Sequence, residues 1–424
     1  MIQFLMKGLL RDRSRSLIPL VTVAVGVFLT VVLFSFLNGI LDTMVHDTAV
    51  FSCGHVKIMT RAYYKEAAQM PNDLALTGMS ALLRNVRQEF PGMVWTPRIR
   101  FGGLLDVPDA AGETKAQGPV AGMGVDLFSP ASPEPRILRL AKAVIRGRLP
   151  SKPGEMLVSD DFAVHLGLQP GDTATLIGST MNGSMATANF VVAGTVRFGI
   201  AALDHGAMIA DLEDVRRALD MDDAAGEVLG FSADLIYRRQ AAEEIAARYN
   251  AVHAKADDKF SPEMVEFRES SGLASYLDMA EYFSTILVII FVTAMSIVLW
   301  NAGLMGSMRR YGEVGVRLAI GEAKGHVYRS MIAESIMIGI AGSMIGTALG
   351  LALSYELQAH GLNIGFLTGN ASILIEESLR ARVTSTSYYL GFLPGLCATF
   401  LGTSISGIGI YKRQTSQLAK EMES

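Results

Sequence analysis

The chain has 424 residues, of which half are hydrophobic and 18% are charged, and its formal net charge at pH 7 is -4. This composition and the positive mean hydropathy disfavour an ordinary soluble domain and indicate a membrane protein. No Gly-Lys dipeptide occurs in the sequence. A nucleotide-binding loop of the Walker type needs Gly-Lys followed by Ser or Thr, so the chain is not expected to hydrolyse ATP itself.

Four windows contain no Asp, Glu, Lys or Arg and are long enough to cross a bilayer: residues 17–37, 282–306, 335–355 and 388–411. About 20 apolar residues cover the ~30 Å of hydrocarbon, and one charge at the centre of a span costs about 2.5–3.5 kcal/mol. We therefore predict four transmembrane helices. An uncleaved anchor is favoured for the first over a cleaved signal peptide, because its apolar run exceeds roughly 7–15 residues and no small-x-small site follows it.

The basic residues around these windows predict the orientation. They gather before the first window, between the second and third, and after the fourth, whereas the loop 356–387 contains only Arg380 and Arg382. The positive-inside bias places both termini and the segment 307–334 in the cytoplasm and the loop 356–387 outside. We expect a multi-pass protein of the cytoplasmic (inner) membrane with a large extracytoplasmic, or periplasmic, domain.

The two ends of the chain complete this topology. Residues 1–16 are amphipathic, with apolar side chains that can face lipid and Lys and Arg side chains that can face headgroups. They predict an elbow helix in the inner interface, although the positive-inside bias alone would also account for the arginines. Residues 412–424 are expected to form a cytoplasmic tail.

Residues 38–260 mix strand and helix patterns and predict an α+β domain inserted between the first two spans. Strands are expected at 50–59 and 93–107 and a helix at 80–90. Asn182-Gly183 predicts a hairpin turn, because this dipeptide favours the turn that joins two paired strands.

Two residues mark helix ends in this domain, and a stalk follows it. Gly167 fits the end of a short helix, and Asp211 fits the cap of a helix that runs to about Leu219. Few Gly or Pro residues interrupt 261–281, which predicts a stalk helix continuous with the second span. A flexible linker is the alternative.

Sites of chemistry are not predicted in this chain. Cys53 and Cys397 should not meet, because one lies in the outer domain and the other in the fourth span. Cys53, His55 and His46 lack a second dense pair of ligands, so no metal site is expected. No catalytic nucleophile stands in a recognisable setting. No charged residue lies within a span, which argues against a proton relay or an ion pathway.

The third span contains a row of glycines, Gly342, Gly346 and Gly350, with Gly339 near the same face. Small residues four apart let two helices approach closely, so we predict a helix-packing or dimer contact along this row. The alternative is that glycine is simply common in membrane helices.

The cytoplasmic segment 307–334 is charged and can form a helix. Arg310 and Glu313-Val314-Gly315 open it, Arg317 and Ala319-Ile320-Gly321 follow, and Glu334 enters the third span. With the outer-domain stretches GEMLVS, LGLQPGDTATL and FVVAGTV, this pattern resembles the FtsX-like, MacB-type permease subunits of ABC transporters. Glu322 stands where that family usually has a small residue.

The resemblance implies a coupling helix that docks on a separate ATPase subunit. Its residues would be Arg309, Arg310, Glu313, Val314, Gly315, Arg317, Ile320, Gly321, Glu322 and Glu334. Arginines there can make charge-assisted contacts, while Val314, Val316 and Ile320 can form an apolar face. An unremarkable basic inner loop is the alternative.

The resemblance also implies a fold, partners and a function. The outer domain would be of the MacB periplasmic core type, and ATP and magnesium would bind to the partner, so that this chain itself holds no cofactor. The expected partners are an ABC ATPase dimer, a second permease copy or a homologous permease, membrane lipids, and a lipoprotein or a periplasmic adaptor; no nucleic acid is expected. The layout is most similar to lipoprotein-releasing permeases of the LolC and LolE types. Alternatives are an FtsX-like signalling permease that regulates an external partner and an efflux permease that works with an adaptor and an outer-membrane channel.

Overall fold

The structure is a computed structural model. It describes residues 13–412 except 110, 199–200, 256, 281, 284, 288, 291–292, 295–296, 299–315, 319 and 364–377. The chain divides into two compact units. The helical unit comprises Met1–Thr43, Tyr276–Asn363 and Ser378–Ser424, and the α/β unit comprises Met44–Ser275 and Ile364–Glu377.

The α/β unit is built on a ten-stranded sheet in the order β12-β1-β11-β3-β4-β9-β6-β8-β5, with β7 paired to both β3 and β8. The β4–β9 and β6–β8 pairs are parallel and the others are antiparallel. The strands are β1 (Val56–Thr60), β3 (Met93–Pro108), β4 (Thr114–Val125), β5 (Val144–Gly147), β6 (Glu155–Ser159), β7 (Thr173–Ser179), β8 (Met185–Val196), β9 (Ala207–Asp211), β11 (Glu227–Ser232) and β12 (Pro262–Glu266). A second, two-stranded sheet joins β2 (Leu76–Thr77) and β10 (Ala224–Ala225).

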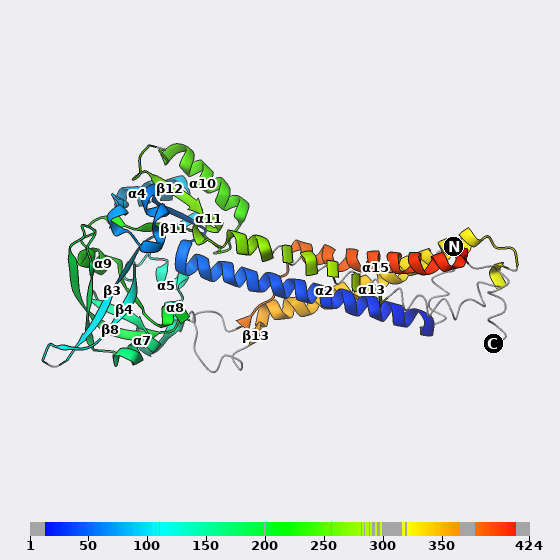
Figure 1. The fold of residues 1–424 in the computed structure, drawn as a ribbon, viewed down its shortest axis with the longest axis horizontal. Coiled ribbons are helices and arrows are strands. Elements are labelled where there is room, and N and C mark those ends of the chain that lie inside the picture. Colours follow the sequence, from blue (N-terminus) through cyan, green and yellow to red (C-terminus); the bar gives the residue numbers. More distant parts are fainter. Residues whose placement is uncertain are drawn as a thin grey trace. The chain divides into compact units, whose positions relative to one another are not determined.

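Short helices cover this sheet (Figure 1). They are the π-helical turn η1 (Ala49–Cys53), α3 (Arg61–Lys65), η2 (Ala67–Gln69), η3 (Asn72–Leu74), α4 (Met79–Glu89), α5 (Glu134–Ile137), α6 (Leu140–Ala143), α7 (Asp160–Leu166), α8 (Ala201–Asp204), α9 (Leu212–Leu219), α10 (Arg239–His253) and α11 (Phe267–Ser271). The core forms where Val86 of α4, Phe162 of α7, Val215 of α9 and Tyr249 of α10 pack with the buried side chains of the strands.

Glycines opposite aromatic residues shape the middle of the sheet. Gly122 stands across from Phe101, and Gly230 stands across from Trp95. A Cβ added to Gly230 would lie 2.5 Å from the Trp95 ring. The missing side chain therefore gives the ring its place on the sheet.

Several local predictions for this unit are confirmed. The 93–107 strand is β3 and the 80–90 helix is α4. Gly167 ends α7 with φ +70°, and the Asp211 side chain accepts from the Glu213 N–H at the start of α9 (3.1 Å). The Asn182-Gly183 turn joins the antiparallel strands β7 and β8.

Two predictions for this unit are wrong in part. The first half of the expected 50–59 strand is η1, and the strand begins only at Val56. The expected 261–281 stalk helix begins instead with strand β12, which pairs with β1. Helix α11 follows and Gly272 ends it with φ +67°; residues 274–280 are helical again.

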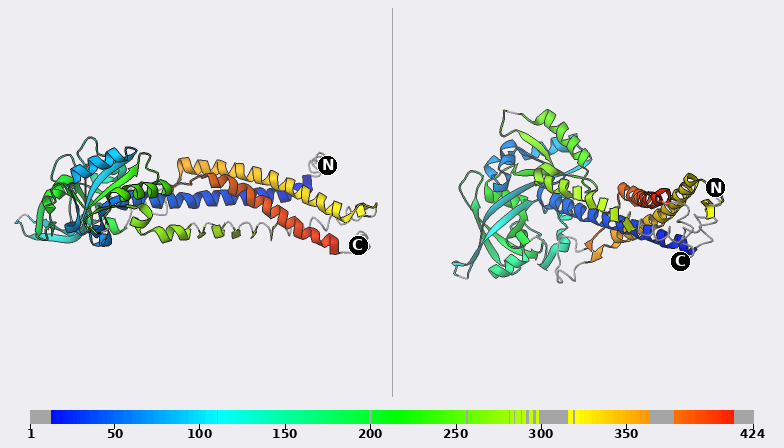
Figure 2. Two further views of the ribbon diagram at one scale, coloured as in Figure 1. Left: turned by 90° about the horizontal axis from the view of Figure 1, so that it is seen from above. Right: turned by 45° about the vertical axis from the view of Figure 1, so that its right-hand side comes forward.

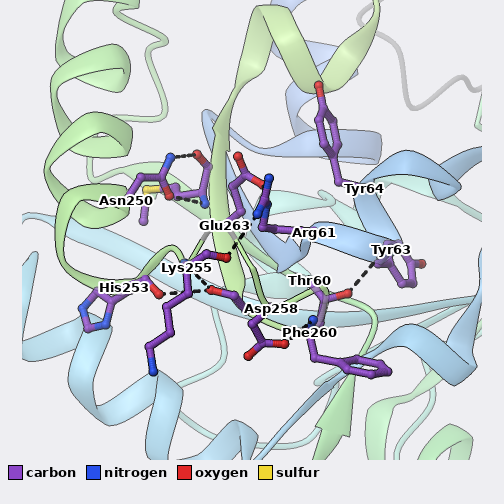
Figure 3. Close-up of polar contacts among 12 residues, drawn as sticks. Thr60, Arg61, Tyr63, Tyr64, Asn250, His253, Lys255, Asp258, Phe260 and Glu263 are labelled. Atoms are coloured by element: carbon purple, nitrogen blue, oxygen red, sulfur yellow. Dashed lines mark hydrogen bonds and ion pairs between the residues drawn. The ribbon is translucent and has the colours of Figure 1, made fainter.

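Contacts with a distant helix explain why 262–266 is a strand. Asn250 of α10 accepts from the backbone N–H of Met264 (2.8 Å) and donates to its carbonyl (2.7 Å). Its amide thus completes the backbone hydrogen bonds that an edge strand leaves open. Arg61, the first residue of α3, also has its Nε atom 3.2 Å from the Glu263 carboxylate of β12 (Figure 3).

The helical unit contains α2 (Arg13–Thr48, which extends into the α/β unit), α13 (Lys324–His360) and α15 (Ser385–Lys412). A short pair, β13 (Leu362–Asn363) and β14 (Ser378–Leu379), precedes α15. Among the described residues, three helical segments are long and apolar enough to cross a membrane: Leu17–Cys53, Lys324–His360 and Ser385–Ile405. Figure 2 shows α2, α13 and α15 running alongside one another.

These segments include or overlap three of the four predicted spans. The predicted span 282–306 falls largely outside the described residues, so the prediction of four spans is not tested there. Residues 1–12 of the predicted elbow and 413–424 of the predicted tail also lie outside them, whereas 13–16 already belong to α2.

Candidate functional site

The predicted coupling segment is described in its second half. Arg309, Arg310, Glu313, Val314 and Gly315 lie outside the described residues. Arg317, Ile320, Gly321, Glu322 and Glu334 are described, and Glu334 lies half-buried on α13. Residues 316–327, apart from 319, are named the coupling corner below.

A helical turn ends inside the coupling corner at Gly321. The backbone N–H of Gly321 donates to the Leu318 carbonyl (3.1 Å), and that of Glu322 donates to the Arg317 carbonyl (3.0 Å). Gly321 has φ +96°. These two bonds around a left-handed glycine form a Schellman motif, which ends a helix and satisfies its last carbonyls. Gly321 therefore determines the direction in which the chain leaves the turn.

The turn packs back on the start of α13. Leu318 and Met331 lie against Val327, which is buried. The Glu322 carboxylate lies 3.6 Å from Nε2 of His326, on the first turn of α13. The coupling corner is therefore a packed element with a defined geometry.

Two apolar side chains of the corner are turned to solvent. Val316 is 53% exposed and Ile320 is 80% exposed. Residues four apart lie on the same side of a helical turn, and apolar residues at this spacing are how a helix anchors itself in a partner's groove. Two of the three residues predicted to form an apolar face, Val316 and Ile320, are thus exposed, and the third, Val314, lies outside the described residues. Leu318, which was not part of that prediction, packs on Val327 of α13.

The glycine row lies against the other helices of the same unit. A Cβ on Gly342 would lie 2.9 Å from Val23 Cβ, one on Gly346 would lie 2.5 Å from the Ala24 carbonyl, and one on Gly350 would lie 2.9 Å from Val31 Cβ. Gly339 faces Thr399 of α15 instead. The row therefore brings α13 close to α2 within one chain; its use as a dimer contact stays a prediction.

A contact at the far end of these helices was not predicted. Gly39 of α2 lies against the segment before α15, where a Cβ would be 2.9 Å from Cα of Ala381. The backbone N–H of Arg382 donates to the Ser35 carbonyl (2.8 Å), and its guanidinium pairs with Asp42. The sequence marked Arg382 only as one of two charges in an outer loop. A glycine facing a loop that far along the chain leaves no local signal.

Two buried ion pairs in the α/β unit were also missed. Arg98 pairs with Glu134, at 2.7 Å, and neither side chain is exposed. Lys57 pairs with Glu227, at 2.8 Å, and both side chains are buried. Charged residues in a strand usually indicate a face turned to solvent, so the sequence pattern hides these pairs.

Two of the three residues first weighed as metal ligands, Cys53 and His55, are buried and hydrogen-bonded, whereas His46 is half-buried. Cys53 donates to the Thr48 carbonyl (3.6 Å). Nδ1 of His55 accepts from the backbone N–H of Ser232 (3.1 Å). Burial lowers the pKa of His55 to about 4, so its ring is neutral at pH 7 and serves as a hydrogen-bond acceptor.

Comparison with known proteins finds a matching family model and several relatives of similar sequence. Residues 285–415 match the FtsX-like permease C-terminal family model. The lipoprotein-releasing system transmembrane protein LolC of Xylella fastidiosa (strain 9a5c) is 24% identical over 233 residues, which cover 53% of this chain and 54% of that protein. The match therefore spans about half the length of that relative. A macrolide export ATP-binding/permease protein MacB of Rhodopseudomonas palustris (strain BisB18) is 27% identical over 124 residues, 27% of this chain and 18% of that protein.

One solved structure is also similar to part of the chain. It is the periplasmic region of MacB from Actinobacillus actinomycetemcomitans, with a TM-score of 0.32, 12% identity and coverage of 53% of this chain and 92% of that one. A likeness of that degree does not establish a shared fold. Residues 285–415 thus match an FtsX-like permease domain, and parts of the chain are similar to the LolC and MacB permeases.

Proposed function

We propose that this chain is the permease subunit of an ABC transporter, on which a separate ATPase subunit docks at the coupling corner and drives motion of the α/β unit outside the membrane. The observation that carries the proposal is the position of the corner. It lies inside the FtsX-like domain, at the start of a helix long enough to cross a membrane, and it exposes an apolar pair.

The geometry supports a mechanical role for the corner. The Schellman motif and the Leu318–Val327 packing join the exposed pair to α13. Helix α13 has 37 residues, which at 1.5 Å per residue is about 55 Å, well beyond the ~30 Å of hydrocarbon. Because the glycine row leaves no gap between α13 and α2, a force applied at the corner is passed to both helices.

The topology completes the proposal. Four spans, with the second at 282–306, would leave both termini and the corner in the cytoplasm and residues 38–281 outside the inner membrane. Arg309, Arg310 and Glu313, which precede the coupling corner in the sequence, would complete the docking surface. A second copy or a homologous permease would complete the transporter, and ATP and magnesium would bind to the ATPase dimer.

The names of the relatives suggest two candidate cargoes. The LolC relatives are named for lipoprotein release, and we take extraction or export of a lipoprotein or another lipophilic molecule as the first candidate. Efflux with an adaptor and an outer-membrane channel is the second, because other relatives are named for macrolide export and pyoverdine export. Those relatives are ATP-binding/permease proteins, whereas this chain has no Gly-Lys dipeptide for a Walker loop.

Purification of the full chain in mild detergent tests the proposal. An ABC ATPase subunit should co-purify with the unsubstituted chain, and both Ile320→Asp and the double substitution Glu313→Lys with Arg317→Glu should abolish its retention. Val164→Asp is the matched control, because Val164 is an apolar residue of α7 that is 64% exposed in the other unit. Equal retention of the ATPase by all four proteins would refute the docking site, and its absence from the unsubstituted sample would refute the proposed subunit.

A further inference from the structure

The π-helical turn η1 follows directly on α2 and is packed inside the α/β unit. Ala49, Val50 and Cys53 are buried. The turn is closed by the Gly54 N–H, which donates to the carbonyl of Ala49 five residues earlier (2.7 Å). Single π turns are rare and are often found at functional sites.

The carbonyl of Val50 lacks both of its possible helical partners. In an α-helix it would accept from the Gly54 N–H, and in a continued π-helix it would accept from the His55 N–H. The Gly54 N–H is bound to Ala49, and the His55 N–H donates to the Gly230 carbonyl of β11 (2.9 Å). Nη1 of Arg98 supplies the missing bond at 2.6 Å.

Arg98 is itself held in place on all sides. It is fully buried on β3, and its Nε and Nη2 donate to the two carboxylate oxygens of Glu134 on α5, at 2.7 and 2.8 Å. The Thr96 hydroxyl donates to the same carboxylate (2.8 Å). A buried ion pair adds little to stability by itself but can select one arrangement among several, and here that arrangement includes the Val50 carbonyl.

We propose that Ala49–Cys53 is a two-state register switch and that Arg98 holds it in the π register by occupying the Val50 carbonyl. When Arg98 releases this carbonyl, the Gly54 N–H moves from Ala49 to Val50 and the turn becomes α-helical. One residue is then taken up by the helix, so the segments on its two sides turn against each other by about 100° and shift by about 1.5 Å. The switch rests on contacts inside the α/β unit and does not depend on an ATPase partner.

Gly54 belongs to the same switch. It leaves the π turn with φ +64°, and a Cβ there would lie 2.9 Å from the Val56 carbonyl. An α-helical Gly54 has a negative φ. A side chain at this position therefore strains the π register and favours the α register.

The reactivity of the Cys53 thiol reports the register of the turn. Cys53 is the last residue of the turn and its thiol is buried, so a change of register should alter its access to a maleimide. The full chain with Cys397→Ser retains Cys53 as its single cysteine, and the rate of its modification by a maleimide is measured. Arg98→Met with Glu134→Leu removes both charges, so neither is left buried alone. This variant should react at least about tenfold faster, with little dependence on denaturant below the unfolding transition, as a local opening requires.

The neighbouring ion pair provides the matched control. Lys57→Met with Glu227→Leu removes an equally buried pair, and Glu227 stands directly opposite Arg98 across the β11–β3 ladder. This pair does not bind the Val50 carbonyl, but Lys57 lowers and Glu227 raises the pKa of the Cys53 thiol. The rates are therefore compared after each is divided by the thiolate fraction of its variant, taken from the pH dependence of modification. On that basis Cys53 should react in the control at the unsubstituted rate. Equal acceleration in the two double variants would overturn the switch, because it would reflect general loosening.

Gly54→Ala keeps every buried charge in place, so it tests the register switch even if the Arg98 variant does not fold. It should also accelerate the modification of Cys53 below the unfolding transition. An unchanged rate in a folded Gly54→Ala protein would overturn the proposal.

Discussion

Replacing Gly346 with Leu should separate α13 from α2. A Cβ at this position would lie 2.5 Å from the Ala24 carbonyl and 2.9 Å from Val27 Cβ, whereas ordinary contact begins near 3.4 Å. The two helices must therefore move apart by roughly 1 Å before even the first carbon of a side chain fits, and the three further carbons of Leu need more room.

The energetic cost follows from this separation. Overpacking a close contact costs about 1–3 kcal/mol, and a gap of about 0.5–1 Å loses a quarter to a half of the dispersion energy of the atoms it separates. Because Gly342 and Gly350 lie one turn to either side and a Cβ on each would also lie within 2.9 Å of α2, the loss extends along the row. A cost at or above the upper end of that range is expected.

Thermal unfolding of the full chain in one detergent, followed by circular dichroism at 222 nm, measures this effect. The Gly346→Leu protein should unfold several degrees below the unsubstituted chain. Ala348→Leu is the control, because Ala348 lies on the same helix and is exposed, so the same side chain meets no helix there. Equal unfolding temperatures for the two variants would refute the assignment of the row to close packing with α2.

The α/β unit offers two further predictions. Burial lowers the pKa of His55 to about 4 in the folded protein, so as the pH falls the unfolded state takes up a proton before the folded state does. The contribution of His55 to the free energy of unfolding is therefore full above about pH 6.5 and falls by about 3 kcal/mol as the pH drops to 4. The urea midpoint should show this loss, and it should be absent in His55→Asn, which keeps an acceptor for the Ser232 N–H; an identical pH dependence in both proteins would contradict the assignment. Gly230→Ala should cost about 1–3 kcal/mol because its Cβ would meet the Trp95 ring, whereas Gly92→Ala, with nothing within 4 Å, should leave the midpoint unchanged; equal midpoints for the two would contradict the packing.

Features set by local chemistry were predictable from the sequence. The charge-free windows led to α2, α13 and α15 because a spanning helix is determined by its own composition. Asp211 and Gly167 marked helix ends because a cap and a left-handed glycine act within a few residues. Gly321 was singled out only by resemblance, and the Schellman motif supplies its physical reason.

Features set by distant partners were not predictable in this way. Residues 262–266 form a strand because Asn250 and β1 complete its hydrogen bonds. The π turn exists beside a guanidinium that comes from β3, 48 residues along the chain. The segment 261–281 has a helical pattern over part of its length, and tertiary pairing overrides it at one end.

In the proposed function the coupling corner and the α/β unit act on opposite sides of a membrane. Single cysteines at Ile320 and Val164, both exposed, test it in chains that carry Cys397→Ser and retain the buried Cys53. In sealed inside-out vesicles a membrane-impermeant maleimide should label Ile320→Cys at once and Val164→Cys only after the vesicles are permeabilised. Labelling of both cysteines in intact vesicles would place the two surfaces on one side and contradict the account.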